Sequence, residues 1–308
     1  MAILQLLIGT NIPFMKFRTV TYMFSGALIL ATAVWLIVHG GPKYSVDFTG
    51  GTLIQLRLSR TLSADGVRKA IDASGLRGVE LQQMTGENRN EFLIRLQATE
   101  GHQNPFPLIQ QAIAARFPGV QVELRRTEQV GPKVGSELRQ KAIWAVLGSL
   151  VGILLYVGIR YEFKFAFGAV VALFHDVFVT LGMLCFTGRE VSLTVVAALL
   201  TIAGYSINDT IVVFDRIRER SKALRKEKHS RAMDIAVNET LSRTVITSLT
   251  VFLTALALFI WGGEELRDFS FAMLVGVGVG TYSSVYVASA LALDIWIRLD
   301  RRKGISAE

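Results

Sequence analysis

The sequence has a single cysteine, Cys185, and charged residues make up only 19% of its 308 residues. One cysteine excludes a disulfide framework within the chain, so cysteine pairing gives no indication of the compartment. The low charge, the 51% hydrophobic content and a mean hydropathy of +0.41 exclude a simple soluble globular protein, a disordered tail and a fibrous repeat. Apolar segments long enough to cross a bilayer are therefore expected.

The sequence also lacks the common catalytic motifs. It contains no Ser/His/Asp order of a hydrolase, no Walker loop, no Cys/His metal cluster and no Rossmann fingerprint. The pair Gly50–Gly51 is not followed by the Lys-Ser/Thr that a phosphate-binding loop requires. The sequence therefore predicts no catalytic residue, no bound metal and no cofactor.

Six stretches are apolar over about the 20 residues that a membrane span needs. They are 19–38, 142–159, 165–186, 191–214, 240–261 and 269–297. The resulting regions are an N-terminus at 1–18 with an interfacial helix over Met1–Phe14, a first span at 19–39, an external domain at 40–138, a five-helix bundle at 139–297 with a basic cytoplasmic loop at 215–239, and a tail at 298–308.

The basic residues fix the orientation of these spans. With a cytoplasmic N-terminus, sixteen Lys and Arg fall in inside segments, against Arg189 and Arg267 in the short outside loops. Because short loops rich in Lys and Arg stay in the cytoplasm, both termini are predicted inside and region 40–138 outside. The net charge of +8 then marks the cytoplasmic edge rather than a nucleic-acid site. We interpret loop 215–239, which holds eight of the sixteen, as an amphipathic helix on anionic headgroups.

The external region has the pattern of a small soluble domain. Alternating residues predict strands at 53–58, 79–84, 92–96 and 120–126, and apolar residues at helical spacing predict helices at 63–74 and 105–117. The order β-α-β-β-α-β is that of the ferredoxin-like split βαβ arrangement. The predicted fold class is a polytopic α-helical membrane protein, with one α+β ferredoxin-like domain between the first two of six helices.

Ionisable residues inside the spans are the main functional signal, because each costs about 2.5–3.5 kcal/mol at a helix centre. Asp209 lies seven residues before Arg216, roughly 10 Å below the interface, and Arg243 enters from the same side. An Asp209–Arg243 ion pair would offset the burial of both groups. Alternatively, Arg243 reaches the headgroups and Asp209 is a structural hydrogen-bond partner.

Further polar residues accompany this pair. Tyr205 and Thr201 share the face of Asp209, with Asn208 beside it, and Thr247, Thr250 and Thr254 continue the face of Arg243. The two stripes are predicted to face one another and hold a file of water, although the threonines can instead bond their own backbone. His175 and Asp176 point roughly 100° apart, so we expect only one of them to face the interior. Small residues recur every fourth position in the sixth span, from Ala272 to Ala292, which predicts close helix packing.

Three stretches of the sequence carry a resemblance to a known family. Val46-Asp47-Phe48-Thr49-Gly50-Gly51 follows the first span. Gly204-Tyr205-Ser206-Ile207-Asn208-Asp209-Thr210-Ile211-Val212-Val213-Phe214-Asp215-Arg216-Ile217-Arg218-Glu219 closes the fourth, and Ser242-Arg243-Thr244 lies in the fifth. Together they resemble the SecD/SecF family of protein-export membrane proteins, and its SecF members in particular. The residues themselves favour a structural role for Asp47, Gly50 and Gly51, as a tight turn with glycines at positive φ.

The resemblance implies a subunit of the resistance-nodulation-division superfamily in the bacterial cytoplasmic (inner) membrane, with its large domain in the periplasm. It implies a separate SecD partner, and use of the proton gradient to help preproteins through the SecYEG channel after the SecA motor. YajC and YidC are further partners that it suggests. The family's intramembrane Asp and Arg fall on Asp209 and Arg243, the predicted proton-translocation residues. Tyr205, Asn208, Thr247, His175 and Asp176 are predicted as accessory polar residues.

Two other functions are consistent with the same sequence. One is half of a small-molecule proton antiporter, for which an external domain of about 100 residues is small. The other is a purely structural factor that holds other membrane subunits together.

Overall fold

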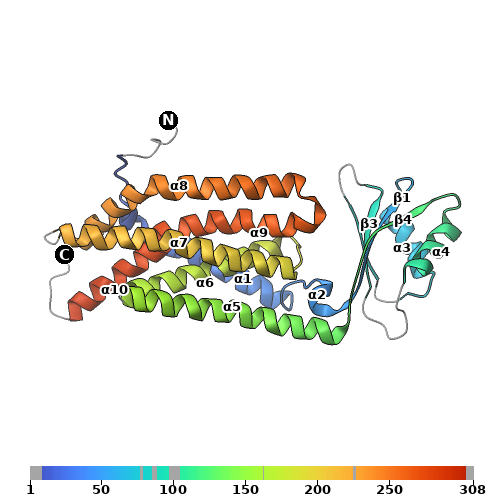
Figure 1. Cartoon of the computed structure of the whole chain (residues 1–308), viewed down its shortest axis with the longest axis horizontal. Coiled ribbons are helices and arrows are strands. Elements are labelled where there is room, and N and C mark those ends of the chain that lie inside the picture. Colours follow the sequence, from blue (N-terminus) through green and yellow to red (C-terminus); the bar gives the residue numbers. More distant parts are fainter. Residues whose placement is uncertain are drawn as a thin grey trace. The chain divides into compact units, whose positions relative to one another are not determined.

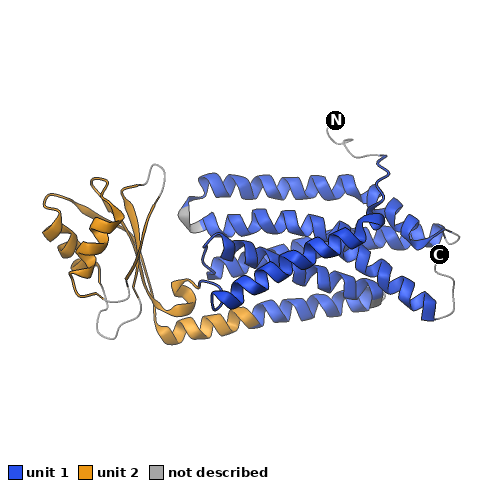
Figure 2. Cartoon of the chain, turned by 180° about the vertical axis from the view of Figure 1, so that it is seen from behind, with its two compact units in different colours: residues 1–43, 144–308 blue, residues 44–143 orange. Residues whose placement is uncertain are grey.

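The computed structural model describes residues 9–76, 79–84, 89–96, 105–161, 163–224 and 227–302. It divides into two compact units, one formed by 1–43 with 144–308 and the other by 44–143 (Figure 2). The predicted interfacial helix at Met1–Phe14 lies mostly outside the described residues.

The described residues of unit 44–143 form a four-stranded antiparallel sheet with three short helices (Figure 1). Its elements are α2 (Val46–Thr49), β1 (Gly51–Leu58), α3 (Ala64–Asp72), β2 (Val79–Gln83), β3 (Glu91–Leu96), α4 (Phe106–Arg116) and β4 (Val122–Val130). The strand order β2-β3-β1-β4 is compatible with the ferredoxin-like arrangement expected from the sequence.

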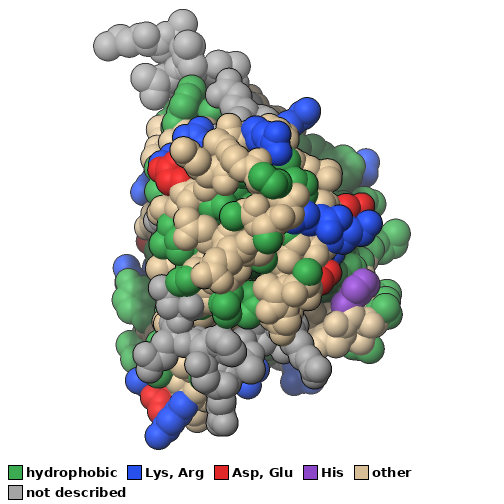
Figure 3. Space-filling view, turned by 90° about the vertical axis from the view of Figure 1, so that its right-hand side faces the viewer, with side chains coloured by type: hydrophobic (Ala, Val, Ile, Leu, Met, Phe, Trp, Pro, Cys, Tyr) green, Lys and Arg blue, Asp and Glu red, His purple; other side chains and the backbone are tan. Residues whose placement is uncertain are grey.

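The alternation of the sequence explains how this unit folds. In β1, Ile54, Leu56 and Leu58 are fully buried, while the residues between them are partly exposed. These side chains pack with Val67 and Ile71 of α3 and with apolar residues of β3 and α4 in one core. The side on which α3 and α4 lie shows charges of both signs among polar and hydrophobic side chains (Figure 3).

Unit 1–43 with 144–308 is a bundle of long apolar helices. Among the residues that the structure describes, six helical segments are long and apolar enough to cross a membrane, as predicted. The helices are α1 (Arg18–Val38), α5 (Pro132–Arg160), which continues from the other unit, α6 (Phe163–Phe186), α7 (Leu193–Ala223), α8 (His229–Trp261), α9 (Gly263–Tyr282) and α10 (Ser289–Arg302). A π-helical turn, η4 (Ser283–Ala288), joins α9 to α10, and a 3₁₀ turn, η2 (Phe14–Phe17), precedes α1.

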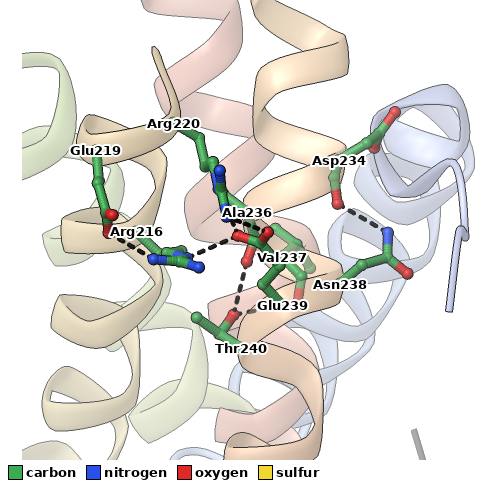
Figure 4. Close-up of polar contacts among 9 residues, drawn as sticks. All are labelled: Arg216, Glu219, Arg220, Asp234, Ala236, Val237, Asn238, Glu239 and Thr240. Carbon is green, nitrogen blue, oxygen red and sulfur yellow. Dashed lines mark hydrogen bonds and ion pairs between the residues drawn. The ribbon is translucent and has the colours of Figure 1, made fainter. Parts of the chain in front are cut away.

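The basic stretch 215–239 differs from its prediction. Helix α7 continues to Ala223 and α8 already begins at His229, so most of the stretch extends two bundle helices and does not form a separate surface helix. The extension is stabilised by ion pairs between the two helices, in which Arg216 and Arg220 both contact Glu239, at 2.6 and 2.5 Å (Figure 4). Two of the eight basic residues of the stretch are thus engaged in contacts between α7 and α8.

Candidate functional site: buried carboxylates in the helix bundle

Asp209 is a buried carboxylate held by hydroxyl groups from two other elements. The residue lies on α7 and exposes 7% of its surface. Its Oδ1 accepts a hydrogen bond of 2.6 Å from Thr244 Oγ1 of α8, and its Oδ2 accepts one of 2.5 Å from Ser284 Oγ of η4. Burial of an ionised carboxylate is costly unless it is hydrogen-bonded or paired, so these two hydroxyls are what makes this position tolerable.

The predicted ion pair between Asp209 and Arg243 is wrong for this structure. Within the described residues no ion pair joins the two, and Arg243 is exposed on α8. The reason is the helical phase. Thr244, the next residue, points at Asp209, and adjacent positions on a helix diverge by roughly 100°.

The predicted row of water molecules between the two polar stripes is wrong for the same reason, because the threonines expected to line it are on the exposed side of α8. Thr247, Thr250 and Thr254 are exposed, and their hydroxyls bond carbonyl oxygens of their own helix. Thr201 likewise bonds the carbonyl of Ala197. Of the two interpretations open for these threonines, the structure supports backbone bonding. The polar face of α8 that points into the bundle is instead Thr240, Thr244 and Ser248, one residue per turn.

Tyr205 belongs to a second chain of hydroxyls beside Asp209. Its OH donates to Ser248 Oγ at 3.0 Å, and Thr281 Oγ1 of α9 donates to the same oxygen at 2.6 Å. Asn208, between Tyr205 and Asp209 in sequence, is exposed on α7. The structure therefore brings Tyr205 towards the site and leaves Asn208 and Thr247 on the outer surface of this chain.

His175 and Asp176 are both buried, which corrects the expectation that only one would face the interior. They expose 1% and 0% of their surfaces, and His175 Nδ1 lies 2.9 Å from Asp176 Oδ1. Asp176 Oδ2 accepts hydrogen bonds from Ser206 Oγ of α7 at 2.5 Å and from Ser283 Oγ of η4 at 2.7 Å. Both can be interior because α6 is enclosed by α1, α7, α9 and η4.

Small residues bring η4 close enough for these contacts. The predicted ridge is buried along its whole length, from Ala272 to Ala292. A Cβ on Gly276 would lie 2.2 Å from Ile202 Cδ1, and one on Gly280 would lie 3.3 Å from Ser206 Cβ. The backbone of α9 thus lies close to the side chains of Ile202 and Ser206 on α7, as the prediction of close packing requires.

An open hollow lies at the basic end of the bundle, next to this site. It measures 310 Å³ and is lined from both helices by Val212, Asp215, Arg216, Glu219, Glu239, Thr240 and Arg243. Asp215 accepts a hydrogen bond from Tyr161, and burial together with this contact raises the pKa of Tyr161 to about 12. Val212 and Thr240, which line the hollow, each lie about one helical turn along the chain from a residue of the Asp209–Thr244 contact.

The N-terminal segment is attached at the same end. The side-chain amide of Asn238 accepts from the backbone N of Ile12 and donates to its carbonyl oxygen, both at 2.9 Å. Asp234 accepts from the backbone N of Met15 at 2.8 Å. Figure 4 shows Asp234 and Asn238 on α8, on the side away from the Arg216–Glu239 contacts.

The turn motif after the first span is a close backbone contact within unit 44–143. Gly50 and Gly51 have φ of 72° and 128°, and a Cβ on Gly50 would lie 2.7 Å from Cα of Pro132. Ser45 caps the preceding short helix by accepting from the backbone N of Asp47 at 3.3 Å. The turn that leads into β1 thus packs against the first residue of α5.

Comparison with known proteins places the chain in a family. The family model described as protein export membrane protein SecD/SecF, C-terminal, matches residues 110–298, and the SecD/SecF GG motif matches residues 35–61. The chain belongs to the SecD/SecF family. It is similar to relatives named protein translocase subunit SecF. The relative from Calditerrivibrio nitroreducens is 45% identical over 92% of this chain and 93% of that protein. The relative from Vibrio alginolyticus is 44% identical over 94% of this chain and 91% of that protein.

A solved structure shares the fold of this SecD/SecF family member. The crystal structure of SecDF from Thermus thermophilus, a translocon-associated membrane protein, superposes with a TM-score of 0.84 at 38% identity. The match covers 95% of this chain but only 39% of the SecDF chain. The chain thus corresponds to less than half of that protein.

The hydroxyl ligands of the two carboxylates are the functional residues that sequence reasoning misses. The repeat of small residues gives Ser284 only a packing role, and no pattern assigns Thr244, Ser206 or Ser283 to a carboxylate. One signal is present, because Thr240, Thr244 and Ser248 follow a four-residue period as regular as that of the threonine stripe. Which of two such stripes faces inward depends on the neighbouring helices.

Proposed function

We propose that this chain is the SecF-type subunit of a proton-driven export complex, which works with a SecD partner to help preproteins cross the membrane through the SecYEG channel. Its membership of a protein-export family and the names of its relatives support the export part. The proton part is carried by one observation. Asp209 is a carboxylate inside a membrane bundle whose described polar contacts are hydroxyls, not a cation.

Hydroxyl contacts suit a carboxyl group that changes its protonation state. A hydroxyl donates to an ionised carboxylate and accepts from a protonated one, so Thr244 and Ser284 can serve Asp209 in both states. A permanent ion pair with Arg243 would instead favour the ionised form alone. The chemistry proposed for Asp209 is uptake of one proton from one side of the membrane and its release to the other.

Water reaches Asp209 from the cytoplasmic side through the hollow between α7 and α8. The hollow lies among the basic residues that the orientation rule places in the cytoplasm. Arg243 lines it, one residue from Thr244, and holds positive charge at the mouth of the path. Arg243 therefore acts on Asp209 from the entrance rather than by direct contact.

A partner covers the exposed polar face of α7 and α8. Asn208, Arg243, Thr247, Thr250 and Thr254 are exposed within membrane-crossing helices, where lipid would leave an arginine and an amide poorly solvated. The chain matches only 39% of the SecDF chain, so SecD is the occupant with the right size and origin. SecA, YajC and YidC would contact this pair only within the larger export machinery.

The location proposed is the bacterial inner membrane, with both termini cytoplasmic and unit 44–143 periplasmic. The sixteen inside Lys and Arg against two outside support this orientation. Relatives named as translocase subunits support a transport role without an enzymatic reaction of the chain's own.

The test is export into inverted membrane vesicles that contain the whole complex, with and without a proton gradient. Asp209→Asn removes the titrating group while retaining its size, so gradient-dependent export is expected to disappear while membrane levels stay normal. Glu137→Gln is the control, because Glu137 is an exposed carboxylate on α5 that is not among the residues lining the hollow. We expect it to export as the wild type does.

Two outcomes would contradict the proposal. Wild-type, gradient-dependent export by Asp209→Asn would favour a structural assembly factor. Loss of drug efflux rather than of export on the same substitution would favour an antiporter half.

A further inference from the structure

We propose that Asp176, together with His175, is a second proton-binding site inside the bundle, and that Ser283 and Ser284 couple its protonation state to that of Asp209. This inference rests on the proposed proton function of Asp209 and extends it to a residue pair on a different helix. It starts from a shared feature of two buried carboxylates. Those on α6 and α7 are each bound by one of two consecutive serines of the same π-helical turn.

Each of these serines has one hydrogen and two acceptors within reach. Ser283 Oγ lies 2.7 Å from Asp176 Oδ2 and 3.1 Å from the carbonyl oxygen of Gly280. Ser284 Oγ lies 2.5 Å from Asp209 Oδ2 and 3.1 Å from the carbonyl oxygen of Thr281. A hydroxyl donates to one acceptor at full strength, so each serine bonds either a carboxylate or its own helix.

The protonation state of the carboxyl determines which acceptor is used. When Asp176 is ionised, Ser283 donates to it. When Asp176 takes up one proton, its new O–H group donates to Ser283 Oγ, and the serine hydrogen turns to the carbonyl of Gly280. Ser284 switches in the same way between Asp209 and Thr281. Only one proton is gained or lost at each carboxyl, and no other covalent bond forms or breaks.

The π-helical turn is the element that both switches act on. Ser283 and Ser284 open η4, and Ser289 Oγ donates to the carbonyl oxygen of Ser284 at 3.0 Å. π-helical turns are rare and are frequently found at functional sites. A change in which serines bond their own helix therefore alters the turn that carries both of them.

His175 supplies the independent sign that protons are handled here. Its Nδ1 faces Asp176 Oδ1, while its Nε2 is buried and has no hydrogen-bond partner among the described residues. A buried N–H without an acceptor would be costly, so the state that fits is a neutral ring whose Nε2 carries a lone pair. That lone pair is an unused proton acceptor next to a buried acid.

The surroundings of Asp176 contribute no compensating charge from the described residues. From α7 it receives the hydroxyl of Ser206, with Asp209 further along the same helix, and from α9 the ring of Tyr282 lies 6.1 Å from that of His175. Tyr282 OH is occupied by Ser25 of α1 at 3.1 Å.

The ion pair between α1 and α10 involves other residues than Asp176. On α1 and α10, Arg18 and Tyr22 contact Asp294. Of the described charged groups around it, only Asp209 shares with Asp176 a connection through η4.

The test is pH-titrated infrared difference spectroscopy of the full complex with its SecD partner in lipid, which detects protonated buried carboxyl groups directly. Asp176→Asn is expected to remove one titrating carboxyl absorption, and Asp209→Asn a different one. Ser283→Ala retains both carboxyls but breaks the coupling, so we expect the titration midpoint of the Asp209 absorption to move by about one pH unit. Ser270→Ala is the control, because this buried serine of α9 bonds the carbonyl of Leu266 in its own helix.

An unchanged set of absorptions in Asp176→Asn would overturn the second site, and an unshifted midpoint in Ser283→Ala would overturn the coupling. If Asp176→Asn fails to accumulate in the membrane, Ser206→Ala and Ser283→Ala still perturb the Asp176 absorption and decide the question. Gradient-dependent export by Asp209→Asn would refute the proposed function without affecting the Asp176 absorption. The two failures are therefore distinguishable.

Discussion

At the scale of single residues, the bundle uses hydroxyl groups in two different ways. Thr244 and Thr247 lie on the same helix, but Thr244 donates to a buried carboxylate and Thr247 only to backbone carbonyls. The sequence identifies Asp209 as a buried acid because its position in an apolar run is visible. It does not identify Thr244 as the partner, since the partner of a helical hydroxyl depends on the rotation of a second helix.

Thr244→Val is expected to destabilise the bundle by about 1 kcal/mol, which is typical of a side-chain hydrogen bond inside a membrane protein. Valine has nearly the same shape, so the loss is that of the hydroxyl. Reversible unfolding in mixed micelles measures the free energy. Thr247→Val is the control, and equal effects of the two substitutions would argue against a special role for the Asp209 contact.

At the scale of elements, glycine spacing determines how α9 meets its neighbours. The four-residue repeat of small residues predicts close packing, and the ridge is buried as expected. The π-helical turn at Ser283–Ala288 has no such signal, because its residues fit an α-helical period equally well. Hydropathy does not reveal the extension of α7 and α8 beyond the apolar spans. It marks only the apolar residues that would lie in the bilayer, whereas both helices continue through charged residues.

Gly276→Ala and Gly278→Ala should differ although they lie two residues apart on α9. A Cβ at Gly276 would lie within 3 Å of three atoms of Ile202, so we expect a loss of about 1–3 kcal/mol from overpacking. A Cβ at Gly278 would meet nothing within 4 Å, and the higher helix propensity of alanine is expected to stabilise the protein slightly. Thermal unfolding of the purified proteins measures this difference in stability. An equal loss of stability at both positions would refute the close approach of α9 to α7 at Gly276.

At the scale of the whole molecule, this chain is one part of a larger assembly. Its length and composition indicate six spans and one small domain, and both are present. The partner surface cannot be read from the sequence, because the period of the threonine stripe does not show which side of α8 faces the interior of this chain. The structure places that stripe outside, where a second membrane subunit can cover it.

Cysteine cross-linking tests that surface. Cys185 is the only cysteine, so Cys185→Ala gives a cysteine-free background. In the assembled complex, Thr250→Cys on the exposed polar face is expected to cross-link to SecD through a short bifunctional reagent. Leu30→Cys, an exposed apolar position on α1, should not. Cross-linking from Leu30→Cys but not from Thr250→Cys would place the partner elsewhere.

The central claim is that the carboxyl of Asp209 carries protons across the membrane. The most direct measurement is proton flux, followed by a pH-sensitive dye inside vesicles that contain the chain with its SecD partner and an imposed pH gradient. The wild-type complex and Glu137→Gln are predicted to dissipate the gradient, while Asp209→Asn at equal protein density is predicted to do so no faster than empty vesicles. Wild-type flux through the Asp209→Asn complex would contradict the claim.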